Sequence, residues 1–201
     1  MSKCSPSPTD AERLRRFNLQ MLDQALTLVA AHERPGSPPY DGPVGAHLRH
    51  VIEHFDALLL PARKGEVDYD ARLRDRALER SPLIARQRLQ ALQQRFMQLD
   101  ERGLDAPLRV HGRGGAGGEF AFTVASSLGR ELVFVASHAV HHYALLHAHC
   151  KQHGIATAAD FGKAPATIAH QRCHQRSVNS KHPAHLAKEP SCQAQAHSPA
   201  P

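Results

Sequence analysis

The chain of 201 residues contains no tryptophan, and aromatic residues make up only 5% of it. No uninterrupted apolar run reaches the roughly 18 residues that a membrane span requires. The first residues also lack the apolar stretch of a signal peptide. These absences predict a cytoplasmic protein with no membrane partner. The hydrophobic share of 41% is still sufficient for the core of a globular protein.

Cysteines are few and scattered. They stand at Cys4, Cys150, Cys173 and Cys192, and no two of them form a C-x-x-C pair. This spacing argues against a disulfide framework and against a zinc ribbon. The formal net charge is +6, of which the segment from residue 172 onward contributes half. The remaining excess is too small for an electrostatic footprint on DNA or RNA, so we expect no nucleic-acid partner.

The apolar pattern predicts four helices, over residues 9–32, 43–60, 81–103 and 126–153. Thr9 and Glu12 have the spacing of a capping box at the start of the first helix. Pro43 occupies the favoured first turn of the second helix. A loop with prolines follows the first helix, and a polar connection without a sustained period, residues 62–80, follows the second.

A small β-hairpin is expected before the last helix. Two alternating runs, residues 108–111 and 119–124, flank a glycine-rich segment at 112–118, which is typical of a hairpin tip. A phosphate-binding loop would need a following helix and a Gly-Lys-Ser/Thr sequence, and both are missing. The predicted organisation is a flexible N-terminus at 1–8, one domain at 9–171 and a disordered tail at 172–201. The predicted fold class is all-α.

The histidines are the candidate functional residues of this chain. Among 16 histidines, His138 and His142 are spaced so that one helix face presents both rings. His47, His50 and His54 form a second stripe on the helix at 43–60. If the two stripes face each other, they bring imidazoles from separate helices together. Such a cluster suits Zn²⁺ or Ni²⁺, and three nitrogens leave a fourth coordination position open.

Several alternatives stay open at this point. The histidines could instead be buried core residues whose ring nitrogens are hydrogen-bonded. On the second helix His50 is central, with Glu53 as a candidate acceptor for a ring N–H, whereas His54 and His47 are alternative ligands. His141 is offset by about 100° from His142 and is expected to face a neighbouring helix or solvent. The Glu-x-x-His repeats of di-iron bundles and the His-Glu-x-x-His of zincins are both absent.

The chain resembles the DinB-like (YfiT-like) superfamily. The resemblance is carried by the histidine pair at 138 and 142 and by His50-Val51-Ile52-Glu53. It extends to the sequences Val-Asp-Tyr-Asp-Ala-Arg-Leu-Arg-Asp at 67–75 and Phe-Gly-Lys-Ala-Pro at 161–165. The family resemblance implies an up-down-down-up four-helix bundle holding one divalent metal through three histidines. The matching positions are His50, His138 and His142.

The resemblance also bears on activity. Similar proteins include metal-dependent thiol S-transferases, isomerases and hydrolases. It therefore implies a small-molecule substrate, with a low-molecular-weight thiol as one cosubstrate. The alternative function is a non-catalytic metal-binding or stress-response protein, and a homodimer is left open. Tyr69, Arg72 and Arg74 are candidate substrate contacts, although a solvated charged loop explains them equally well.

Overall fold

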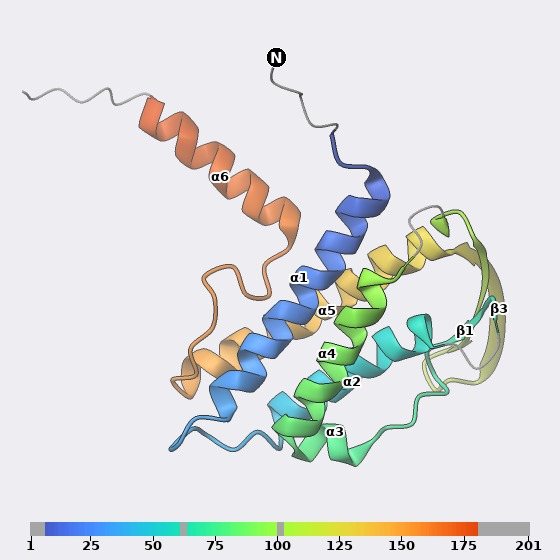
Figure 1. Cartoon of the computed structure of the whole chain (residues 1–201), viewed down its shortest axis with the longest axis horizontal. Helices are drawn as coiled ribbons and strands as arrows, with labels where there is room; N and C mark the ends of the chain where they lie inside the picture. The colour runs from blue at the N-terminus through green and yellow to red at the C-terminus, as the bar shows by residue number, and fades with distance from the viewer. Residues whose placement is uncertain (1–6, 61–63, 100–102, 181–201) are drawn as a thin grey trace, which may run out of the picture. The chain divides into compact units, whose positions relative to one another are not determined.

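The computed structural model describes residues 7–60, 64–99 and 103–180. The protein is mostly helical with a small three-stranded sheet (Figure 1). None of the helices in these ranges is both long and apolar enough to cross a membrane.

Helices α1 (Asp10–His32) and α2 (Pro43–Leu59) begin where their capping residues predict. Thr9 Oγ1 accepts the N–H of Glu12 at 3.1 Å, and a Glu12 carboxylate oxygen accepts the N–H of Thr9 at 2.6 Å. This confirms the predicted capping box, which satisfies two amides that the helix itself leaves unpaired. Pro43 is the first residue of α2 and follows Gly42, whose φ of 98° favours glycine.

The two later long helices are α4 (Pro82–Met97) and α5 (Leu128–Gln152). Their N-caps are Ser81 and Ser127, whose hydroxyls each accept a backbone N–H of the first turn. Helix α4 ends at Met97, before the end predicted at residue 103. The end of α5 lies within one residue of the prediction.

The long helices share one core. Helix α1 packs against α4 and α5, and α2 packs against the same two helices. The rings of Phe55 on α2 and Phe96 on α4 meet edge to face with centroids 5.8 Å apart. Tyr143 on α5 is fully buried and donates its hydroxyl to the carbonyl of Met21 on α1 at 2.8 Å. Each fully buried large side chain contributes roughly 1.5–3 kcal/mol, so these contacts hold α2 against α4 and α5 against α1.

The sheet has the strand order β1 (Glu66–Asp68), β2 (Pro107–Gly114) and β3 (Phe120–Ser127). Strands β2 and β3 form the predicted hairpin, with Val110 opposite Val124, and β1 runs parallel to β2. The structure differs from the prediction in the connection at 62–80, which was expected to contain no regular secondary structure. It contains β1 and the short helix α3 (Arg76–Arg80), while residues 61–63 lie outside the described part. Three-residue strands are too short for periodicity to detect.

The segment after α5 docks on that helix. Phe161 is buried, and its ring stacks on Tyr143 with centroids 5.1 Å apart. Gly162 has a φ of 71°, and a Cβ there would lie 2.4 Å from the backbone nitrogen of Ala144. Only glycine therefore allows this close approach.

Helix α6 (Pro165–Ser180) belongs to a second compact unit that begins at Pro165. Its residues from 165 to 176 are largely exposed. The predicted domain boundary after residue 171 falls inside this helix. The predicted tail at 172–201 is thus helical as far as Ser180, and its remainder, 181–201, lies outside the described residues, as do residues 1–6 of the predicted flexible N-terminus.

Candidate metal centre

Helices α2 and α5 bring three predicted ligands together. His50 Nε2 lies 2.9 Å from His138 Nε2, and His142 Nε2 lies 3.2 Å from the same atom. The three residues form a group in which one ligand atom from each lies within 4.8 Å of the other two. The spacing of four residues places His138 and His142 one turn apart on α5, and the packing of α2 supplies His50.

The donor set fits a divalent transition metal. Zinc–nitrogen bonds of about 2.0–2.1 Å in a tetrahedron separate the ligand nitrogens by about 3.3–3.4 Å. The observed separations of 2.9 and 3.2 Å need only a small outward movement of the rings. All three side chains are partly buried. The three nitrogens converge on one point, which three independently hydrogen-bonded core histidines would not require.

The environment keeps these imidazoles neutral. Burial is the largest cause in each case, lowering the pKa of His50 to about 2 and the pKa values of His54, His138 and His142 to about 4. Neighbouring histidines and the positive charge of Arg72 lower all four pKa values further. At neutral pH the rings therefore offer lone pairs rather than positive charges, as metal ligation requires.

Two further histidines, His47 and His54, form hydrogen bonds with residues of the three-histidine group. His47 Nδ1 lies 2.7 Å from His142 Nδ1, so His47 partners the outer nitrogen of that ring. His54 is buried, and its Nδ1 lies 2.7 Å from the carbonyl oxygen of His50, to which it donates. His141 is exposed and lies outside the three-ligand group. These positions match outer partners that hold ligands in place.

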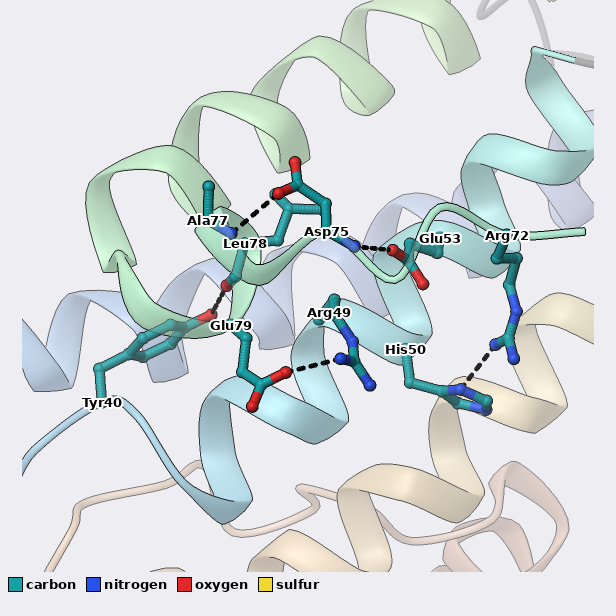
Figure 2. A network of polar contacts seen from close by, with 9 residues as sticks. All are labelled: Tyr40, Arg49, His50, Glu53, Arg72, Asp75, Ala77, Leu78 and Glu79. Carbon is teal, nitrogen blue, oxygen red and sulfur yellow. Dashed lines mark hydrogen bonds and ion pairs between the residues drawn. The ribbon is translucent and has the colours of Figure 1, made fainter.

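Glu53 forms a hydrogen bond that the sequence did not predict. Sequence reasoning made it an acceptor for a histidine ring N–H. In the structure its carboxylate is buried and accepts the backbone N–H of Asp75 at 2.7 Å (Figure 2). Glu53 therefore anchors the start of α3 to α2.

Residues 69–75, here called the strap, connect β1 to α3. Tyr69 donates its hydroxyl to a carboxylate oxygen of the buried Glu131 at 2.8 Å, and its ring stacks on His54 with centroids 5.4 Å apart. Arg72 Nη1 lies 2.6 Å from His50 Nδ1 and 2.9 Å from His54 Nδ1. Arg74 is exposed and donates to the carbonyl of Arg72 at 3.4 Å. Of the three predicted substrate contacts, Arg72 and Tyr69 reach the histidines.

A cavity of about 960 Å³ borders the neighbouring face of α2. Its lining includes Glu53 and Asp56 on α2, Arg88 on α4, and Arg72, which thus contacts both the cavity and the histidines. Sequence reasoning missed Asp56 and the cavity. The sequence feature that could have indicated this site is the i, i+3 spacing of Glu53 and Asp56, which gives α2 an acidic face beside its histidine face.

Comparison with known proteins gives little further information. No family model matches the chain, and no solved structure matches it. A curated protein named FK506-binding protein 5, from Rhizopus delemar, is 33% identical over 104 residues. These residues are 52% of this chain and 27% of that protein, so the chain spans about a quarter of the length of this relative.

Proposed function

We propose that this chain is a DinB-like (YfiT-like) four-helix bundle that binds one divalent metal ion, Zn²⁺ or Ni²⁺, through His50, His138 and His142. The observation that carries the proposal is the convergence of three Nε2 atoms from two helices. The bundle is supported by the mutual packing of α1, α2, α4 and α5. The long connection between α2 and α4 also fits the up-down-down-up order.

The proposed activity is that of a metal-dependent transferase or hydrolase acting on a small molecule, with a low-molecular-weight thiol as one cosubstrate. A bound metal would supply Lewis-acid chemistry that activates a nucleophile near neutral pH. The chain's own residues hold the site: His47 orients His142, and the His54 contact with the His50 carbonyl stiffens α2 at the ligand. A three-ligand group favours this activity, because it leaves a coordination position for a reactant.

The alternative is a non-catalytic metal-binding protein. It is favoured if His54 becomes a fourth ligand, since its ring centroid lies only 4.2 Å from that of His138. Within the described residues, however, His54 falls outside the ligand group, and its Nδ1 is engaged by the His50 carbonyl. These observations support the three-ligand site over the four-ligand one.

Cobalt substitution tests the open position. Co²⁺ reports its ligands by visible absorption, so the protein loaded with Co²⁺ is titrated with 2-mercaptoethanol. We expect a new near-ultraviolet charge-transfer band, because a thiolate can enter the fourth position. The His141→Ala variant should behave like the wild type, since His141 lies outside the ligand group. A cobalt spectrum that thiol leaves unchanged would show a closed site and favour the binding protein.

A further inference from the structure

Arg72 places a positive charge beside the histidines, and no carboxylate among the described residues is in direct contact with it. The guanidinium is partly buried, and its Nε is buried without a hydrogen-bond partner among the described residues. The described residues provide no carboxylate ion pair for Arg72, whereas Arg49, Arg86 and Arg88 each have one. A partly desolvated cation without an anion is costly. It therefore points to a ligand that supplies the missing negative charge.

The acceptor that Arg72 uses is His50. His54 Nδ1 donates its proton to the carbonyl of His50, so it cannot also accept from Arg72. Arg72 Nη1 therefore donates to His50 Nδ1 at 2.6 Å (Figure 2). A neutral imidazole that accepts at Nδ1 carries its proton on Nε2. That proton can be donated to His138 Nε2, 2.9 Å away.

Metal binding removes this acceptor. If His50 ligates through Nε2, its proton must move to Nδ1, which then becomes a donor facing the donor Arg72. His142 has no such conflict, because His47 can accept the proton on its outer nitrogen. The two carboxylates that most influence Arg72, Glu53 and Asp70, accept the backbone N–H groups of Asp75 and Arg113, and neither forms an ion pair with Arg72. The loaded site thus has two adjacent donors and a gain in positive charge.

We propose that the metal-loaded site binds a small carboxylate, whose oxygens accept hydrogen bonds from Arg72 and from His50 Nδ1. The inference rests on the proposed metal site and assigns its substrate class as a carboxylate-bearing small molecule. A single planar guanidinium matches a carboxylate in geometry and charge. Since the anion relieves a conflict that the metal creates, metal and anion bind with positive coupling. By linkage each strengthens the affinity for the other equally.

The experiment measures Co²⁺ affinity in excess acetate and in chloride of equal ionic strength. In the wild type we expect acetate to tighten Co²⁺ binding by about fivefold or more, the lower range of typical coupling between sites. Arg72→Gln should abolish the acetate effect, and Arg72→Lys should retain part of it. The matched control is Arg109→Gln, which removes a positive charge from an exposed position on β2 and should keep the full effect. Thermal unfolding checks that each variant folds.

The remaining outcomes overturn the inference in distinguishable ways. An equal acetate effect in the wild type and in Arg72→Gln would show that acetate binds without Arg72. The absence of any acetate effect in a protein that binds Co²⁺ would show that Arg72 needs no external anion, and would point to Glu53, the charged group that most influences it, as the compensating carboxylate. A wild type that fails to bind Co²⁺ overturns the proposed metal site together with this inference.

Discussion

Helix α2 presents two polar faces of different chemistry. The face toward α5 gathers His50 and His54 with His138 and His142, and the packing of their rings leaves them neutral. The neighbouring face carries Glu53 and Asp56. There each carboxylate has its own donor: Asp75 N–H for Glu53 at 2.7 Å and Arg88 for Asp56 at 2.9 Å. Each carboxylate of the acidic face therefore has a hydrogen-bond donor within the chain.

This difference separates a structural face from a binding face. Carboxylates paired one by one with backbone or arginine hold the strap and α4 in place. Neutral imidazoles that face one another satisfy only part of their hydrogen-bonding capacity, and their nitrogens can become metal ligands once the protons between them are displaced. The comparison predicts that disruption of the acidic face lowers stability, whereas disruption of the histidine face lowers metal affinity.

The largest effect should come from acid, which acts on the histidines and on Asp56 in opposite directions. The histidine pKa values of about 4 in the folded protein lie below the usual 6.5. Their contribution to stability is thus present above pH 6.5 and is lost as pH falls towards 4. Burial raises the pKa of Asp56, so its charge destabilises the fold at neutral pH, and protonation relieves that cost in acid.

Urea unfolding of metal-free protein between pH 7 and pH 4 measures this effect. The free energy of unfolding should fall across that range, and the fall should be smaller in a His138→Gln/His142→Gln double variant. An unchanged slope in the double variant would show that the acid sensitivity arises elsewhere.

The next effect concerns the acidic face. Replacing Glu53 by alanine should lower the free energy of unfolding by about 2 kcal/mol, because it removes the charge-assisted hydrogen bond between the buried Glu53 carboxylate and the N–H of Asp75. Glu53→Gln keeps an acceptor oxygen and should cost less. Asp56→Ala is the matched comparison on the same face. It removes the partly exposed pair with Arg88 but also the cost of a buried charge, so the net loss should be about 1 kcal/mol or less. Chemical denaturation measures all three, and equal losses at Glu53 and Asp56 would contradict the contacts described here.

The sequence allowed the long helices and the grouping of the three histidines to be predicted, because both depend on local signals. Caps such as Thr9 and Ser81 and the spacing of His138 and His142 act within a few residues. The strap contacts depend on residues far apart in the chain. Glu53 meets Asp75, and Tyr69 meets Glu131, only after β1 pairs with β2 and the helices pack. The hydrogen bond between Glu53 and Asp75 could therefore not be predicted from the histidines that neighbour Glu53 in the sequence.

The central claim is that three converging histidines bind one divalent metal ion. Elemental analysis of tag-free protein, dialysed against a weak chelator to remove loosely held ions, tests it most directly. We expect about one equivalent of metal in the wild type and in His141→Ala, and its loss in His138→Ala/His142→Ala, because a single remaining ligand cannot hold the ion. A wild type without metal, or a double variant with full occupancy, would contradict it.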